Sequence, residues 1–187
     1  IFASAIKDSN SGILKILLNE ERYKKYRMTP TIFNSKEYHF EYILPDEKNF
    51  KADLIIIATK NDGLNWAIKN INNFVSKNTI IISILNGIRS EREIINTYKD
   101  SKVITSFYIG HSCIRQDRNI FQDGIYEIVI GSTNKNEKYA LKKLSLFLEK
   151  SNIKYRVSDS IEDEYWKKFM INVGVNQLCA LTGLSLK

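Results

Sequence analysis

Two short runs of apolar, mostly β-branched residues constrain the fold of this chain most strongly. They are Asp53-Leu-Ile-Ile-Ile-Ala-Thr59 and Thr79-Ile-Ile-Ile-Ser-Ile84. Unbroken apolar runs of this length are typical of strands buried on both faces, which occur in parallel sheets covered by helices. Between the runs, apolar residues from Leu64 to Val75 recur at helical spacing. The sequence therefore predicts a β-α-β unit with parallel strands.

The same alternation extends over most of the chain. We expect strands at 13–18, 103–108, 125–130 and 153–157, an extended stretch at 29–43, and helices at 1–6, 90–98 and 136–150. Residues 20–26 are read as a loop or short helix, and Ser90 with Glu93 as a capping box. This order predicts an α/β fold with a mostly parallel sheet and helices on both faces. The alternation stops near Ser158, so we place a domain boundary there, between residues 1–157 and 158–187.

A long helix is predicted from Ser160 to Gly183. Ser160 with Asp163 approximates a capping box at its start, and Gly183 is a plausible stop because glycine accepts a left-handed conformation. From Phe169 onward the helix is apolar nearly all round, which predicts that it is buried.

Four polar residues of this helix, Glu164, Lys168, Asn172 and Asn176, recur at every fourth position and so share one side. A buried amide without a partner costs about 1–3 kcal/mol, and a buried ammonium costs more. In one interpretation the amides cap a neighbouring loop and Lys168 extends to water. In the other, the stripe is the polar wall of a substrate cleft, with Lys168 as an acid and the amides as hydrogen-bond donors.

Two predicted strand ends carry polar residues. Ligands of open parallel sheets lie at the carboxyl ends of the strands. Ala58-Thr59-Lys60 places a cation beyond the first buried strand, and Ile84-Leu85-Asn86-Gly87 follows the second. Lys60 is either a solvated loop residue or close to a ligand. Asn86 and Gly87 form either a simple turn or a point where a ligand approaches the backbone and Asn86 orients it.

The glycine loop that binds dinucleotides on such sheets, Gly-x-Gly-x-x-Gly, does not occur in this sequence. If the sheet binds a dinucleotide, its first strand and loop would precede Ile1, and residues 1–6 would belong to the helix that the loop opens. At the other end, a single buried helix cannot form a core alone. We therefore expect the chain to be incomplete at both ends.

Three motifs occur in a fixed order: Asp53 to Lys60, then Leu85-Asn86-Gly87, then W-x-K-x-x-x-N-x-x-x-N from Trp166 to Asn176. Together they resemble the ketopantoate reductase (2-dehydropantoate 2-reductase) family, and the third motif is the most specific. The resemblance implies that residues 1–157 form a Rossmann-like NAD(P)-binding domain and that residues 158–187 begin an all-helical substrate domain. It also implies NADPH-dependent reduction of ketopantoate to pantoate, in pantothenate synthesis.

The resemblance implies a role for each candidate residue. Lys168 would be the general acid, Asn172 and Asn176 would bind the substrate, Asn86 would lie beside both nicotinamide and substrate, and Lys60 would approach the cofactor. Hydride addition builds negative charge on the carbonyl oxygen, which a positioned ammonium stabilises and protonates. No metal is expected.

The sequence leaves alternatives open for the cofactor and for the activity. Arg22, Lys24 or Lys25 would suit the 2′-phosphate of NADPH, whereas Glu20 would suit the free ribose hydroxyl of NADH. The alternative activities are a related hydroxy acid dehydrogenase with the same two domains and a nucleotide-binding protein without catalysis.

The net charge of +7 suits an anionic ligand. The lysines are scattered and no nucleic-acid-binding motif is found, so we expect no nucleic acid partner. No apolar run reaches the roughly 20 residues of a membrane helix, no signal peptide is recognised, and Cys113 and Cys179 lack metal-site spacing. We expect a cytoplasmic enzyme acting on a small 2-keto acid without a membrane partner, with a homodimer suggested by the resemblance. Residues 1–187 alone are expected to be inactive.

Overall fold

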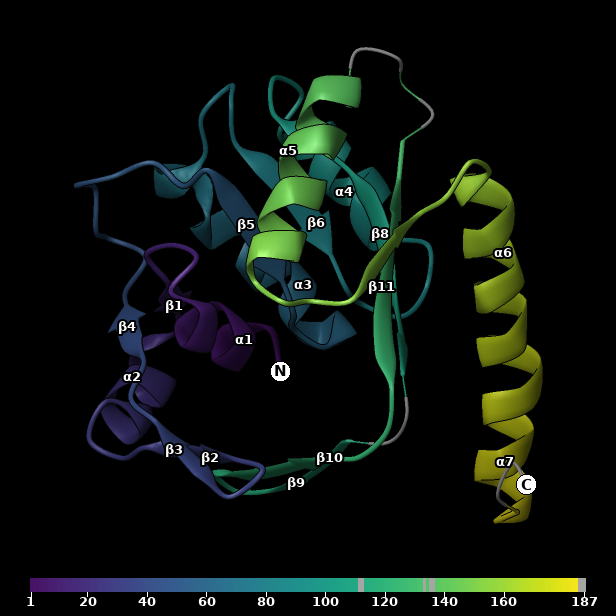
Figure 1. The fold of residues 1–187 in the computed structure, drawn as a ribbon, viewed down its shortest axis with the longest axis horizontal. Helices are drawn as coiled ribbons and strands as arrows, with labels where there is room; N and C mark the ends of the chain where they lie inside the picture. The colour runs from purple at the N-terminus through teal and green to yellow at the C-terminus, as the bar shows by residue number, and fades with distance from the viewer. Residues whose placement is uncertain (111–112, 133, 135–136, 185–187) are drawn as a thin grey trace.

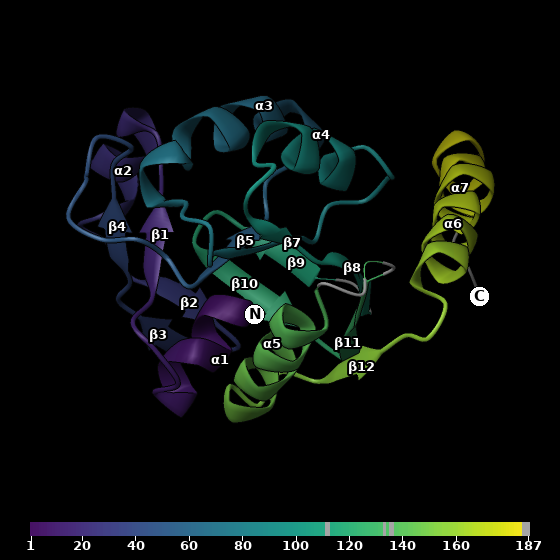
Figure 2. The same cartoon turned by 90° about the horizontal axis from the view of Figure 1, so that it is seen from above.

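The computed structural model describes residues 1–110, 113–132, 134 and 137–184, and the structural statements below refer to these residues. Figure 2 shows three layers, with a central sheet between two pairs of helices. On one face lie α3 (Asn61–Asn70) and α4 (Ser90–Thr97), and on the other lie α1 (Phe2–Ser9) and α5 (Lys138–Lys150). The predicted α/β fold is confirmed.

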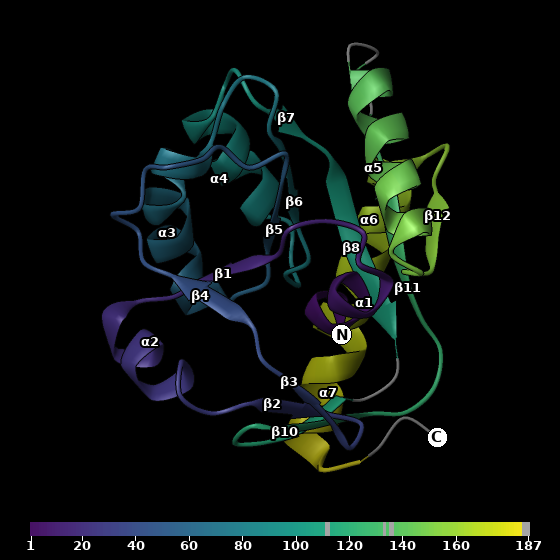
Figure 3. The same ribbon diagram turned by 60° about the vertical axis from the view of Figure 1, so that its left-hand side comes forward.

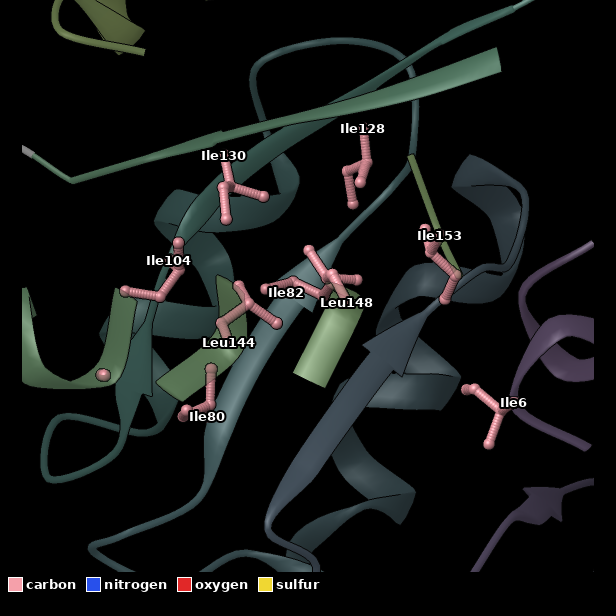
Figure 4. Close-up of a cluster of buried hydrophobic side chains, with 10 residues drawn as sticks. Ile6, Ile80, Ile82, Ile104, Ile128, Ile130, Leu144, Leu148 and Ile153 are labelled. Carbon is pink, nitrogen blue, oxygen red and sulfur yellow. The ribbon is translucent and has the colours of Figure 1, made fainter. Parts of the chain in front are cut away.

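The two apolar runs form neighbouring parallel strands of a three-stranded sheet, in which the second run is the middle strand. β5 (Leu54–Ile57) pairs with β6 (Ile80–Ser83), which pairs with β7 (Lys102–Val103). In β6, Ile80 and Ile82 pack toward α1 and α5, as Figure 4 shows, while Ile81 packs toward α3 and α4. Full burial of such a side chain contributes about 1.5–3 kcal/mol, so an apolar run on both faces selects the central position.

A second three-stranded sheet, next to the first, mixes strand directions. β8 (Thr105–Gly110) follows β7 after one residue and pairs antiparallel with β11 (Tyr126–Gly131), which pairs parallel with β12 (Tyr155–Val157). Strand pairing across the described residues is therefore mostly but not wholly parallel.

The extended stretch at 29–43 is divided between two smaller sheets. In the first, β1 (Lys15–Leu17) pairs parallel with β4 (Glu41–Ile43). The second has the order β3-β2-β10-β9, formed by Lys36–Tyr38, Thr31–Phe33, Asn119–Gln122 and Cys113–Gln116. Figures 1 and 3 show β2 beside β10 although about 90 residues separate them in the sequence. The β9–β10 hairpin was not predicted, because its strands are polar and mostly exposed.

Two shorter elements complete the connections between the strands. α2 (Glu20–Tyr26) shows that residues 20–26 form a short helix, and η1 (Asn72–Phe74) is a 3-10 turn after α3. None of the helices in the described part of the chain has both the length and the apolar character that crossing a membrane requires.

The last helix runs beside β8 and β11 in Figures 1 and 2 and consists of three segments. They are α6 (Ile161–Ile171), the π-helical turn η3 (Asn172–Asn176) and α7 (Gln177–Thr182). Gly183 ends it with φ of 70°, which confirms the predicted stop. The last three residues of the predicted second domain, 185–187, lie outside the described residues.

The predicted burial of this helix from Phe169 onward is wrong. Met170, Leu178 and Leu181 are 68%, 61% and 83% exposed. The physical reason is that α6 packs against the sheet through β8 and β11, and no described element covers the opposite apolar face.

Both predicted capping boxes are also wrong in detail. Ser160 is the N-cap of α6, but its side chain makes no capping bond; instead its backbone N–H donates to the Ser158 hydroxyl at 3.1 Å. The N-cap of α4 is Arg89, and Ser90 is a buried first residue whose hydroxyl donates to Glu91 at 2.8 Å. At Ser90 the tertiary contact with Ser83, whose hydroxyl donates to the Ser90 oxygen at 2.8 Å, takes the place of a capping bond.

Candidate functional site

A narrow crevice separates the loop after β6 from the face of α6. Its lining consists of Leu85, Asn86, Gly87, Phe107, Tyr165, Lys168, Phe169 and Asn172. The space between them is about 170 Å³ including its solvent-open part, yet it has no room for a water molecule. Any larger ligand therefore requires the two walls to move apart.

The first wall is the turn that ends β6. Gly87 has φ of 102°, a conformation that side chains rarely adopt, and a Cβ added there would meet no atom within 4 Å. The Asn86 side chain is exposed and has no hydrogen-bond partner among the described residues. The turn thus presents a free amide and an open backbone at the carboxyl edge of the sheet.

The second wall is α6, where Lys168 is half-buried. Lys168 has no hydrogen-bond or ion-pair partner in the described part of the chain, and burial lowers the pKa of its ammonium group. Asn172 lies one turn further along and also lines the crevice. The structure therefore brings Lys168 and Asn172 opposite Asn86.

Asn176 is exposed and does not line the crevice. Its Nδ2 donates to Oδ1 of Asn172 at 3.0 Å, within the π-helical turn that starts at Asn172. Such turns interrupt α-helices frequently at functional sites. Asn176 thus orients the Asn172 amide, leaving the Asn172 NH₂ group free to donate into the crevice.

Glu164, the first member of the polar stripe, faces away from the crevice. Arg156 donates to it through two nitrogens, at 3.0 and 2.6 Å, and Ser158 donates at 2.6 Å. These bonds lower the pKa of Glu164 to about 2. Glu164 therefore attaches the start of α6 to β12 and the residue after it.

Three contacts seat α6 on the sheet domain. A Cβ added at Gly131 would lie 2.6 Å from the Ile161 Cβ, so only glycine allows the helix this close to β11. The Tyr165 ring packs on Phe107 with a centroid distance of 6.0 Å, and its hydroxyl donates to the Glu91 carboxylate. These contacts hold the first half of α6 against the sheet domain.

Lys60 lies at the same sheet edge but outside the crevice lining. It is exposed and is the N-cap of α3. Next to it, the buried Thr59 hydroxyl oxygen has no hydrogen-bond partner in the described residues. An unpaired buried hydroxyl is costly, so this edge offers a polar group to a ligand.

A second hollow, of about 240 Å³, lies between the end of β1, the start of α1 and the β2–β10 strands. Arg22, Arg115 and Arg118 line it together with Tyr26, over whose ring the Arg118 guanidinium lies at 4.4 Å. Cationic and aromatic groups together favour an anionic ligand with a planar ring.

The other charged residues predicted near this hollow have surface partners. Glu20 pairs with Lys24 at 2.6 Å, and Lys25 with Asp117 at 3.4 Å. Of the three cations considered for a 2′-phosphate, only Arg22 lines the hollow.

No group of three or more His, Cys, Asp or Glu residues that could hold a metal is found among the described residues. Cys113 and Cys179 are free thiols.

Sequence reasoning missed Glu91, Phe107 and Tyr165. Tyr165 had a usable signal, since it stands three residues before Lys168 and seven before Asn172, and therefore on the same helix face. Glu91 had none, because a glutamate in the first turn of an amphipathic helix is usually solvated.

Comparison with known proteins places this chain in a family. The sequence profile described as "Ketopantoate reductase PanE/ApbA" matches residues 9–135, which is more than half of the chain. The 2-dehydropantoate 2-reductase of Streptococcus pyogenes serotype M6 is 23% identical over 137 residues, covering 73% of this chain and 45% of that protein. The chain thus spans about half the length of the curated relatives it matches.

Two solved structures share the fold. D-mandelate dehydrogenase, in a ternary structure with NADH and anilino(oxo)acetate, aligns with a TM-score of 0.83 and 21% identity over 98% of this chain and 61% of that chain. The 2-dehydropantoate 2-reductase of Geobacter metallireducens GS-15 aligns with a TM-score of 0.82 and 17% identity over 97% of this chain and 62% of that chain. From the profile match over most of its sequence, the chain belongs to the ketopantoate reductase family.

Proposed function

We propose that the protein carrying this chain reduces a small 2-keto acid, ketopantoate, to its 2-hydroxy acid, pantoate, with NADPH as the hydride donor. The observation that carries this proposal is the crevice in which Lys168 and Asn172 stand opposite Asn86, in a chain of the ketopantoate reductase family. Pantothenate synthesis in the cytoplasm is the corresponding cellular role.

Lys168 acts as the general acid in this proposal. Its ammonium lacks a carboxylate partner among the described residues, so its charge is available to a developing oxyanion. Burial lowers the pKa of Lys168 toward the working pH, which makes the group a better proton donor. The proton passes from Nζ to the carbonyl oxygen of the substrate.

The asparagines orient the substrate. Because Asn172 Oδ1 already accepts a hydrogen bond from Asn176, the Asn172 NH₂ group donates to the substrate carboxylate. Asn86, on the opposite wall, contacts both the substrate and the nicotinamide side. Groups held before binding reduce the cost of orienting a small acid.

The residues present fit a nicotinamide dinucleotide. The unpartnered Thr59 hydroxyl, the open backbone at Gly87 and the arginine-lined hollow all border the carboxyl side of the parallel strands. Arg22 would meet a 2′-phosphate, and Lys60 would approach the diphosphate side. The cofactor supplies the hydride; Lys60, Asn86 and Arg22 bind and orient it.

We infer that residues 158–187 begin the substrate domain and residues 1–157 form the cofactor domain. In support, the chain leaves the sheet after β12, and the exposed apolar face of α6 and α7 would be covered by further helices of that domain. The crevice then lies between the domains and opens when they separate.

A second candidate is an NADH-dependent dehydrogenase of another 2-hydroxy acid. It is favoured by the likeness to D-mandelate dehydrogenase, whose solved structure contains NADH. A panel of 2-keto acids, each assayed with NADPH and NADH, separates the two activities.

The protein could also act as a homodimer, since the ketopantoate reductase of Staphylococcus aureus is described as dimeric. We propose this state for the present protein. Light scattering coupled to size exclusion gives the mass that decides it.

The test of the proposed function is Lys168→Ala in the protein as its gene encodes it. We expect kcat for ketopantoate to fall by about 10²–10⁴-fold, the usual contribution of a positioned acid. Lys167→Ala, which removes the exposed neighbouring lysine, is the matched control and should keep kcat within about twofold. Unchanged turnover in Lys168→Ala would remove it from the acid role.

The same assay addresses the remaining alternative. A wild-type protein that is stabilised by NADPH in thermal unfolding but reduces no acid of the panel would be a non-catalytic nucleotide-binding protein. Residues 1–187 expressed alone are expected to show no turnover, and detectable reductase activity would contradict that expectation.

A further inference from the structure

A buried chain of hydrogen bonds links the two walls of the crevice. On the α6 side, the Tyr165 hydroxyl donates to Oε2 of Glu91, which also accepts from Ser90 at 2.8 Å. On the sheet side, Ser83 donates to Ser90 at 2.8 Å and accepts from the Leu85 backbone N–H at 3.3 Å. Leu85 immediately precedes Asn86, so this hydrogen-bonded network connects the helix that carries Lys168 with the turn that carries Asn86.

The centre of this chain is an expensive group to bury. Glu91 is only 6% exposed, and its second oxygen, Oε1, has no hydrogen-bond partner among the described residues. A buried carboxyl that is only partly satisfied lowers stability relative to an apolar residue of similar size. Fold stability alone therefore does not account for a glutamate here.

The network contacts α6 on the helix face that carries Lys168. Tyr165 and Lys168 are three residues apart on one face of α6, and the Tyr165 ring is seated on Phe107 of β8. The ring contact fixes the height of the helix above the sheet. The hydroxyl bond to Glu91, at the start of α4, fixes the rotation of the helix about its own axis.

We propose that Glu91 and Tyr165 are positioning residues that hold the Lys168 ammonium in register with the Asn86 amide across the crevice. The proposal rests on the proposed reductase function, which it deepens by naming what sets the geometry of the acid. Neither residue contacts the substrate; both act through the helix and the turn.

The experiment compares Tyr165→Phe and Glu91→Leu with wild type in the protein as its gene encodes it. Each change removes the bond while keeping a side chain of similar size. We expect kcat per folded enzyme to fall about 10-fold or more, because misplacement by a fraction of an ångström to 1 Å costs up to about 10²-fold. The dissociation constant of NADPH should change less than kcat, since Arg22 and Lys60 do not belong to the hydrogen-bonded network.

A conservative variant and a double variant test whether the two residues act through the same hydrogen bond. Glu91→Gln keeps an acceptor for Tyr165 and should recover most of the activity lost in Glu91→Leu. The double variant Tyr165→Phe/Glu91→Leu should be no slower than the worse single variant, because both break the same link. Tyr98→Phe is the matched control: it removes another tyrosine hydrogen bond, to the Ile68 carbonyl, away from the crevice.

A structure-only role predicts a different outcome. It would lower the unfolding temperature in the variants while kcat per folded molecule and its pH profile stayed at the wild-type values, and that result would overturn the proposal. Hydrogen exchange over residues 161–171 is the readout independent of activity: we expect it to rise at least 10-fold in Tyr165→Phe and not in Tyr98→Phe. If wild type reduces no 2-keto acid, the proposed function fails, and unchanged exchange would then overturn the positioning role separately.

Discussion

Gly131 allows α6 to pack closely against β11, and replacing it with alanine tests whether this packing sets the geometry of the proposed active site. The added Cβ would lie 2.6 Å from Cβ, 3.0 Å from Cγ1 and 3.1 Å from Cγ2 of Ile161. Carbon atoms in favourable contact are about 3.5–4.0 Å apart. The first turn of α6 must therefore move outward by about 1 Å, because two backbone-attached carbons cannot rotate out of the way.

The displacement has two measurable consequences. Overpacking of this kind costs about 1–3 kcal/mol of stability, which corresponds to about 2–4 °C in Tm per kcal/mol for a domain of this size. Lys168 is seven residues further along the same helix, about 10 Å at 1.5 Å per residue. A shift of about 1 Å at the reacting groups lowers kcat by about 10²-fold.

The assay measures kcat with ketopantoate and NADPH at a temperature well below the unfolding transition, with thermal unfolding in parallel. Gly12→Ala is the control, because its added Cβ would meet only the Phe147 ring at 3.6 Å, an ordinary contact. We expect this control to keep wild-type kcat and to be neutral or up to about 1 kcal/mol more stable. Wild-type turnover and Tm in Gly131→Ala would show that α6 is not held by this contact.

Two further predictions concern stability. In the folded protein the pKa of Glu164 is held at about 2 against an ordinary 4.5, so its ionised form contributes stability that is fully present above about pH 4.5 and is lost as the pH falls toward 2. Between those pH values the urea midpoint of Glu164→Gln should therefore decline less than the midpoint of wild type or of the exposed-site control Glu162→Gln. Parallel curves of midpoint against pH would contradict this. Leu148 of α5 is fully buried against the sheet, so Leu148→Ala should lower the free energy of unfolding by about 2–5 kcal/mol. Leu146→Ala, at an exposed position of the same helix, should change it by no more than about 0.5 kcal/mol. Equal losses in the two variants would refute the assignment of the core.

The sheet and its helices were predictable because their signals are local and repeated. The run from Thr79 to Ile84 had to be a central strand, since Ile80, Ile81 and Ile82 need apolar partners on two faces. The stop at Gly183 followed from backbone sterics alone. Likewise, the order of motifs was enough to place Lys60, Asn86, Lys168 and Asn172 at one edge of the sheet or on the helix beside it.

The capping box at Ser90 failed because its hydroxyl bonds to Ser83 and Glu91, and the contact with Ser83 depends on the packing of α4 against β6. At Ser160 the side chain makes no capping bond, and the backbone N–H donates to the Ser158 hydroxyl. The predicted burial of α7 failed for a related reason. An apolar pattern states that a face needs a cover, but only the arrangement of other elements decides whether one is present, and Leu181 has none in the described structure.

The sequence by itself therefore determined the buried strands β5 and β6, the amphipathic helices α3 and α5 and the helix end at Gly183, because these follow from periodicity and backbone sterics over a few residues. Only the folded chain decided that Asn176 bonds to Asn172 outside the crevice, that Glu164 pairs with Arg156, and that Glu91 meets Tyr165. Glu91 and Tyr165 are 74 residues apart in the sequence, and no one-dimensional pattern encodes the distance between segments so far apart.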